Sequence, residues 1–234
     1  MITGVANGAS YQAGIAPNAW AEINGTNLAP VTDTWTVVNG VLPTSLDGVS
    51  VTVGFSPAFV YYISPTQINI AVPPSVGTGA LPVVVKTPAG SSTAFTVASS
   101  TYDPALFPWP GGQPVATHSD FTWAVSNGTF PSTTTVPAKP GETIILWGTG
   151  FGPTAPAVPP GIIVPVQNFP STTLPTISVG NTPALVYGAA LAPGFAALWQ
   201  VAFQVPPALA DGNYSLTGAI GGVTFQAQTF TVHN

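Results

Sequence analysis

Short stretches in which apolar and polar residues alternate recur along the whole chain. The clearest runs from Trp199 to Val205, where every second residue is apolar. This period of two predicts a strand with one buried face, and residues 67–72 and 49–53 show the same pattern. The 25 glycines and 27 prolines are scattered between these stretches and leave no room for a long helix. We therefore expect an all-β protein.

The alternating stretches belong to a pattern that occurs twice, in the same order. Both occurrences contain Gly-Thr-x-[Leu/Phe]-x-Pro, then Val-Gly-x-x-Pro-Ala-x-Val-Tyr, then Val-Pro-Pro. The matching segments are residues 17–30 and 140–153, 53–61 and 179–187, 67–74 and 200–207, and 95–97 and 230–232. Ordered duplication of this kind predicts two tandem modules with loops of different length. We place their boundary at 100/101, which gives domains 1–100 and 101–234.

This motif set carries a family resemblance. Together with the opening Val5-Ala6-Asn7-Gly8-Ala9-Ser10-Tyr11 and the linker Pro104-Ala105-Leu106-Phe107, it resembles the immunoglobulin-like IPT/TIG modules. It is most similar to the tandem modules at the C-terminal ends of large secreted proteins of soil bacteria. The resemblance implies two tandem immunoglobulin-like β-sandwich domains and an extracellular or cell-surface location. It implies no particular activity, because these modules are mostly of unknown function.

The charge content narrows the range of partners. Only 4% of the residues are charged, against about 25% in a typical soluble domain, and Lys86 and Lys139 are the only basic residues. Binding to nucleic acid needs clustered Lys and Arg, so it is excluded, and an anionic membrane surface is disfavoured. No apolar run is long enough for membrane insertion as a helix. So low a charge fits either a secreted protein adapted to harsh surroundings or a subunit that packs against other molecules of itself.

Few residues could perform chemistry. There is no cysteine, and the two histidines are His118, within His118-Ser119-Asp120, and His233 at the chain's end. The members of a catalytic triad usually come from separate segments of the chain, so the His118-Ser119-Asp120 motif is expected to be a solvated loop. The seven acids stand singly, which leaves bound Ca²⁺ as a weak alternative. Gly148-Thr149-Gly150-Phe151-Gly152 predicts a turn, because prolines instead of a helix follow it. We expect no enzyme, no cofactor and no metal site.

Aromatic and apolar residues give the candidate binding surfaces. In the aligned strands at 20–24 and 143–147, alternation turns Trp20, Ile145 and Trp147 away from the core, which makes them candidates for an assembly interface. Packing between the domains is the alternative explanation. The terminal segment adds three more candidates, Ile2, Val5 and Tyr11, because an extended uncharged stretch can pair with a sheet edge on a neighbour. Three other aromatics lie in or near expected loops and could stack on sugars: Trp35, Trp109 and Trp123.

These observations favour an extracellular structural protein that self-assembles head to tail into a filament or surface layer. The alternative is a carbohydrate- or protein-binding adhesion module of a larger secreted protein, with surface glycans as partners. A weaker alternative is a non-catalytic accessory region of a secreted enzyme. The residues at 31–46 and 154–174, which differ between the two occurrences of the pattern, are expected to be loops.

Overall fold

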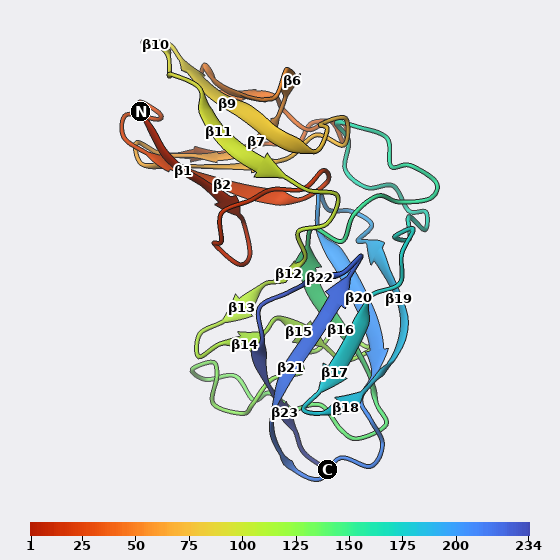
Figure 1. Cartoon of the computed structure of the whole chain (residues 1–234). Helices are drawn as coiled ribbons and strands as arrows, with labels where there is room; N and C mark the ends of the chain where they lie inside the picture. Colours follow the sequence, from red (N-terminus) through yellow and green to blue (C-terminus); the bar gives the residue numbers. More distant parts are fainter.

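The computed structural model describes residues 1–234 and contains strands but no helix, so the predicted all-β, β-sandwich fold class is confirmed. Accordingly, no helix is present that could span a membrane. Figure 1 shows the N-terminal half, drawn in red to yellow, above the C-terminal half, drawn in green to blue. The two termini lie at opposite ends of the molecule.

Two antiparallel sheets form the N-terminal half. The first has the order β1 (Ile2–Asn7), β2 (Trp20–Gly25), β8 (Gln67–Ala71), β7 (Phe59–Ile63) and β3 (Asp33–Thr34). The second has the order β10 (Gly90–Ser91), β9 (Gly79–Thr87), β5 (Val49–Val53) and β4 (Ser45–Leu46), with β11 (Phe95–Ser99) beside β9 and β6 (Ser56–Pro57) beside β5. Buried residues of both sheets, among them Ile23, Ile68, Val51 and Val83, form one core between them.

The C-terminal half repeats this plan. One sheet has the order β12 (Ala105–Leu106), β16 (Thr143–Thr149), β20 (Trp199–Gln204) and β19 (Leu185–Leu191), with β15 (Ala116–Thr117) beside β16. The other has the order β18 (Thr182–Pro183), β17 (Thr176–Val179), β21 (Gly212–Ile220) and β22 (Val223–Thr224), with β23 (Gln228–Val232) beside β21. A small hairpin pairs β13 (Pro108–Trp109) with β14 (Gln113–Pro114).

The alternation at Trp199–Val205 produces the core of this half. Trp199, Val201, Phe203 and Val205 are all fully buried, as their spacing predicts. Full burial of such a side chain stabilises the folded state by about 1.5–3 kcal/mol. The core of the C-terminal half contains residues from 106 to 232, whereas that of the N-terminal half contains residues from 2 to 97. The chain therefore has two separate hydrophobic cores.

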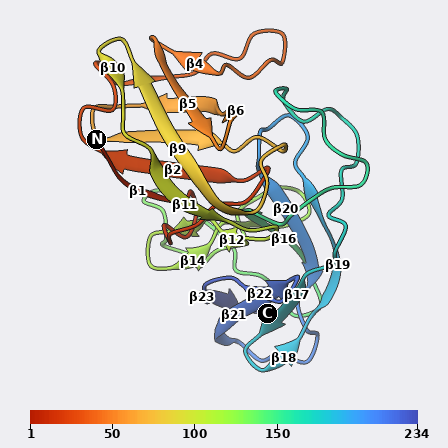
Figure 2. The ribbon, with the colours of Figure 1, turned by 45° about the horizontal axis from the view of Figure 1, so that its top comes forward.

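The two segments expected to be loops, 31–46 and 154–174, meet each other. Val41 and Ile162 form an isolated antiparallel bridge, Leu42 N–H donates to Gly161 O at 2.8 Å, and Ile163 N–H donates to Gly40 O at 2.7 Å. In Figures 1 and 2 the teal segment that contains Ile162 reaches up beside the N-terminal half. These segments join the halves, which the sequence pattern did not predict.

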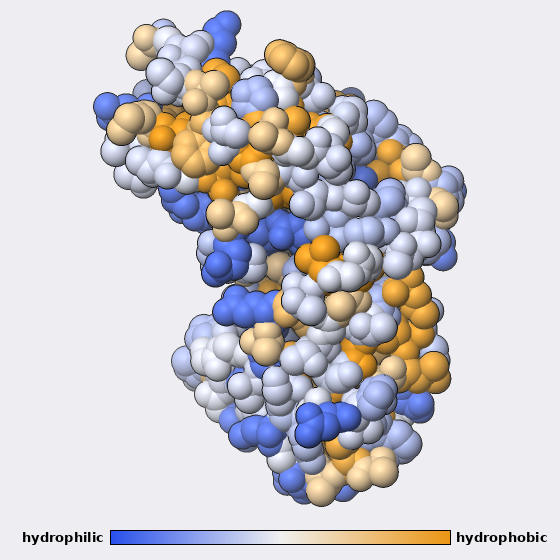
Figure 3. All heavy atoms as spheres, viewed as in Figure 1, coloured by the Kyte–Doolittle hydropathy of each residue, from blue (hydrophilic) through white to orange (hydrophobic).

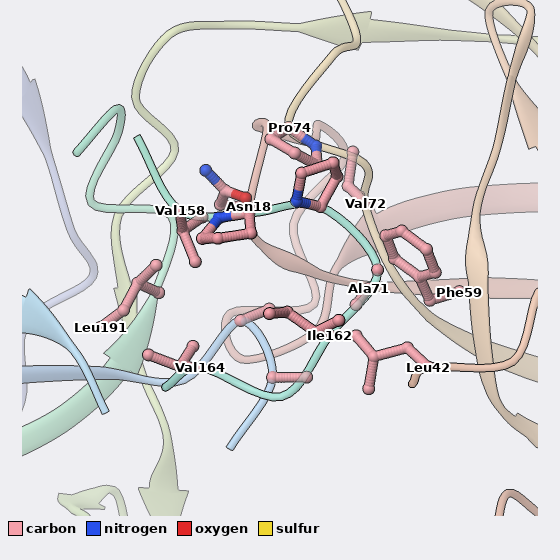
Figure 4. A pocket seen from close by; sticks show the side chains of 15 residues that line it. Asn18, Leu42, Phe59, Ala71, Val72, Pro74, Val158, Ile162, Val164 and Leu191 are labelled. Carbon is pink, nitrogen blue, oxygen red and sulfur yellow. The ribbon is translucent and has the colours of Figure 1, made fainter. Parts of the chain in front are cut away.

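Apolar side chains from both halves pack around this contact. Figure 4 shows Leu42 and Phe59 of the N-terminal half facing Val158, Val164 and Leu191 of the C-terminal half across a small cavity of about 30 Å³. Thr149, which is fully buried, adds a polar link: its Oγ1 accepts from Trp20 N–H at 2.8 Å and donates to Ala197 O at 3.0 Å. The halves are thus held together by packing and by hydrogen bonds.

Candidate functional site

Two neighbouring surfaces carry most of the outward aromatic residues. One lies on the β2–β8–β7 face of the N-terminal half, the other on the β15–β16–β20 face of the C-terminal half. Phe107, which follows β12, lines a hollow on each of them. The two surfaces therefore adjoin at the point where the halves meet. Figure 3 shows that the side it presents is hollowed between the halves and that several hydrophilic residues gather at this hollow.

The surface of the C-terminal half is an apolar groove of about 740 Å³. We call it the apolar groove, and its lining residues are Phe107, Val115, Thr117, Phe121, Trp123, Trp147, Pro193, Phe195, Leu198 and Gln200. Three of its aromatic side chains are strongly exposed to solvent: Phe121, Phe195 and Trp123. The Thr117 hydroxyl accepts a hydrogen bond from Trp147 Nε1 at 3.1 Å, so Gln200 is the main polar side chain left for a ligand.

A short turn holds Phe121 at the rim of the apolar groove. Phe121 has φ of 65°, a left-handed conformation that is rare for a bulky residue and costs of order 1–3 kcal/mol. Its N–H donates to His118 O, and Thr122 donates from both N–H and Oγ1 to Asp120 Oδ1. The Thr122 hydrogen bonds hold the pKa of Asp120 below its usual value. Strain of this kind is typical of functional positions.

His118 anchors the same turn. Its Nδ1 lies 2.6 Å from Glu142 Oε1, and its Nε2 lies 3.0 Å from Val136 O. His233 is far along the chain and contacts Asp211 at 3.5 Å on the surface. Both ring nitrogens of His118 are therefore engaged in holding the turn, which presents Phe121 to the apolar groove. No three His, Asp or Glu side chains converge in a way that could hold a metal ion.

The surface of the N-terminal half combines aromatic and polar side chains. We call it the polar–aromatic face, and it consists of Trp20, Glu22, Asn24, Trp35, Tyr61, Gln67 and Asn69. The Trp20 ring centroid lies 5.8 Å from that of Trp35 and 5.2 Å from that of Tyr61. Beside this trio, a hollow of about 240 Å³ is lined by Gly8, Trp20, Ala21, Tyr61, Asn69 and Phe107.

Four of the nine residues singled out from the sequence fall on these two surfaces. Trp20 and Trp35 lie on the polar–aromatic face, and Trp147 and Trp123 line the apolar groove. Trp109 packs instead against Trp123 and Phe130, with ring centroids 5.2 and 4.8 Å apart. Ile145 is half-buried on β16, next to Ala202 of β20.

The terminal candidates need a correction. Ile2 and Val5 are buried in the core of the N-terminal half, because β1 is paired with β2 in the same molecule. Their side chains stabilise the fold and are not free to contact a neighbour. Tyr11 is exposed, and it lines a different groove, between β1 and β11. The strand at the other end of the chain, β23, is likewise paired within the molecule, with β21.

Comparisons with known proteins find only low similarity. No family model and no curated protein matches it. Among solved structures, SGBP-B of a Bacteroides ovatus mixed-linkage glucan utilization locus, in complex with a mixed-linkage heptasaccharide, is 13% identical with a TM-score of 0.38. That alignment covers 94% of this chain and 43% of the other.

Two further structures show the same level of likeness. SGBP-B from a complex xyloglucan utilization locus in Bacteroides uniformis is 17% identical with a TM-score of 0.28, covering 98% of this chain and 48% of that one. Domains 5–6 of the S-layer protein SbsC are 14% identical with a TM-score of 0.29, and the alignment covers 100% of this chain and 98% of that one. The chain spans less than half the length of the two SGBP-B structures. Likenesses this weak carry no conclusion about function.

Proposed function

We propose that the protein is an extracellular structural subunit that assembles head to tail through the apolar groove. The single observation that carries this proposal is the groove itself, about 740 Å³ with aromatic walls left open to solvent. Exposed apolar surfaces of this kind usually mark an interaction site for protein. The extracellular location rests on the resemblance to secreted modules.

In this proposal, the side chain of Phe55 from a neighbouring molecule fills the apolar groove. Phe55 stands at the tip of the β5–β6 hairpin and is 98% exposed. The matching hairpin of the C-terminal half has Asn181 at this position, so the turn itself does not need an aromatic residue. Phe55 is not among the residues that line the groove of its own molecule, and Figures 1 and 2 show the β5–β6 hairpin apart from β16 and β20.

A contact between Phe55 and the apolar groove joins two different surfaces. Such heterologous contacts do not close on themselves in general and propagate as open filaments. Burying one Phe contributes about 1.5–3 kcal/mol, so the surrounding surfaces must contribute as well. Because no ionised residue lines the groove, assembly should persist at high ionic strength. The proposal includes no catalysis, since His118 Nε2 lies against the Val136 carbonyl oxygen and not against a hydroxyl that it could activate.

The test replaces Phe55 by the residue of the matching hairpin. We expect the unmodified protein to form species larger than a monomer in light scattering at high concentration and in high salt. Phe55→Asn and Phe195→Asn should both be folded monomers. Val166 is also 98% exposed but does not line the groove, so Val166→Asn should assemble normally.

Two results would contradict the proposal. If the unmodified protein stays monomeric at high concentration, head-to-tail assembly fails, and the adhesion-module interpretation replaces it. If Phe55→Asn assembles as well as Val166→Asn does, the contact lies elsewhere. The adhesion-module interpretation has its own support in the polar–aromatic face of the N-terminal half.

A further inference from the structure

We propose that the polar–aromatic face binds a neutral oligosaccharide. This inference is independent of assembly, because it concerns a different half of the molecule. It starts from four side chains on neighbouring strands. In the β2–β8 ladder, Glu22 is opposite Asn69 and Asn24 is opposite Gln67, and alternation turns all four away from the core.

Hydrogen bonds connect these four side chains into one row. Glu22 Oε1 accepts from Asn24 Nδ2 at 2.7 Å, and Glu22 Oε2 accepts from Gln67 Nε2 at 3.0 Å. Gln67 Nε2 also donates to Asn69 Oδ1 at 2.8 Å. Each side chain is thus held in place before a ligand arrives, which lowers the entropy lost on binding.

The row keeps both kinds of hydrogen-bonding group free. Asn24 Oδ1 and Gln67 Oε1 remain as acceptors and Asn69 Nδ2 as a donor, since none of them makes a hydrogen bond within the protein. A sugar hydroxyl both donates and accepts, so neighbouring hydroxyls can pair with a row that offers acceptors as well as a donor. Asn69 also lines the 240 Å³ hollow, where the row meets the aromatic trio.

The aromatic trio suits the other side of a sugar ring. Trp20, Trp35 and Tyr61 are tilted or edge-on to one another at centroid distances of 5.2–5.8 Å, so they form a wall and not a flat stack. Tyr61 is 38% exposed. The C–H face of a pyranose is apolar and can pack on such a wall, while its hydroxyls reach the row.

Charge decides which sugars fit. Glu22 is the acid of the face, and neither lysine lies on it: Lys86 is on β9 of the opposite sheet and Lys139 precedes β16 in the other half. A uronate, sulfate or phosphate group would meet a carboxylate with no cation to compensate it. The ligand class is therefore a neutral glycan.

The duplication provides an internal comparison. The cross-strand pair Glu22–Asn69 corresponds to Ile145–Ala202 in the C-terminal half, at the same position of the same ladder. Because the sandwich forms equally well with the apolar pair, the fold does not require the polar one. One half thus carries polar groups on this face where the other carries apolar ones.

Affinity electrophoresis through gels that contain a soluble β-glucan, a xylan or a galactomannan tests the proposal, with polygalacturonate as the charged control. We expect at least one neutral polysaccharide to retard the protein and polygalacturonate to leave it unaffected. The double variant Glu22→Ile/Asn69→Ala gives this face the chemistry of the C-terminal half. Its affinity should fall at least about tenfold, the loss expected for hydrogen bonds to charged and amide groups.

Val166→Asn is the matched control, because Val166 lies on neither surface, and this variant should assemble normally and bind the same polysaccharide as strongly as the unmodified protein. Circular dichroism and urea unfolding should show the double variant folded. The proposal is overturned if none of the neutral polysaccharides retards the protein, if polygalacturonate retards it equally, or if the double variant binds undiminished. Loss of assembly in Phe55→Asn would leave this result unchanged, so the two proposals can fail separately.

Discussion

At the scale of single residues, Asp103 shows how this nearly uncharged chain uses a carboxylate. Asn7 Nδ2 donates to Asp103 Oδ2 at 3.1 Å and to Asp103 O at 2.7 Å, which fixes the start of the second half against the first. Burial raises the pKa of Asp103 above its ordinary value of 3.8, although the Asn7 hydrogen bond acts in the opposite direction. The folded protein thus binds this proton more tightly than the unfolded chain does.

A pH prediction follows from that direction. The contribution of Asp103 to stability is fully present below pH 3.8 and is lost as the pH rises through the raised pKa. In Asp103→Asn this loss should be absent. As the pH increases, the free energy of unfolding of the variant should therefore rise relative to that of the unmodified protein. Urea unfolding at a series of pH values measures the difference. A difference that does not change with pH would show that Asp103 is not desolvated.

At the scale of elements, the β21–β22 hairpin depends on two adjacent glycines. Gly221 and Gly222 form its two-residue loop, both with positive φ, as a type I′ turn requires. A Cβ at Gly221 would lie 2.3 Å from the Tyr102 ring, whereas a Cβ at Gly222 would meet nothing within 4 Å. The Tyr102 hydroxyl is held by Thr173 at 2.7 Å, which limits how far the ring can move.

The two glycines therefore form a matched pair for mutation. Gly221→Ala and Gly222→Ala both place alanine in a left-handed conformation, which costs about 1–2 kcal/mol. Gly221→Ala should cost about 1–3 kcal/mol more, because the ring or the hairpin must shift. Thermal unfolding of the two variants gives the comparison. Equal destabilisation would mean that Tyr102 moves away freely.

The elements also show what could be predicted from the sequence. Period-two alternation and turn residues gave the strands at 20–24, 67–72 and 199–205, because both act locally. The contact between 31–46 and 154–174 was missed, since it joins segments that lack periodicity and differ between the halves. The row at Glu22 needs the β2–β8 register, which alternation alone does not provide. The division at 100/101 stays a prediction, although the two cores contain residues on either side of it.

A fuller alignment of the two halves with each other could have identified more residues of the candidate site from the sequence. Aligning them places Glu22 opposite Ile145 and Phe55 opposite Asn181, and both differences are visible in the printed sequence. The left-handed conformation of Phe121 had no such signal, because it has no counterpart in the N-terminal half. Ile2 and Val5 were misplaced because a short terminal strand gives no evidence of whether its partner is in the same molecule.

At the scale of the whole molecule, Thr149 is one of the buried polar links between the halves. Thr149→Val removes the acceptor for Trp20 N–H and the donor to Ala197 O, and leaving such groups unpaired costs about 1–3 kcal/mol. We expect a lower urea midpoint, with the unfolding of the two halves beginning to separate into two transitions. Thr143→Val is the control, because Thr143 lies on the same strand without a side-chain hydrogen bond. A midpoint equal to that of the control would show that the link contributes nothing.

The joined loops at Val41 and Ile162 have a geometric consequence. Because the halves are fixed to each other, every molecule in a head-to-tail chain would apply the same rotation and the same translation to the next one. Repeating one such step generates a helix with a single pitch. That pitch would depend on the loops within each subunit as much as on the contact between subunits, so a change in loop length at 154–174 should alter the pitch of the filament.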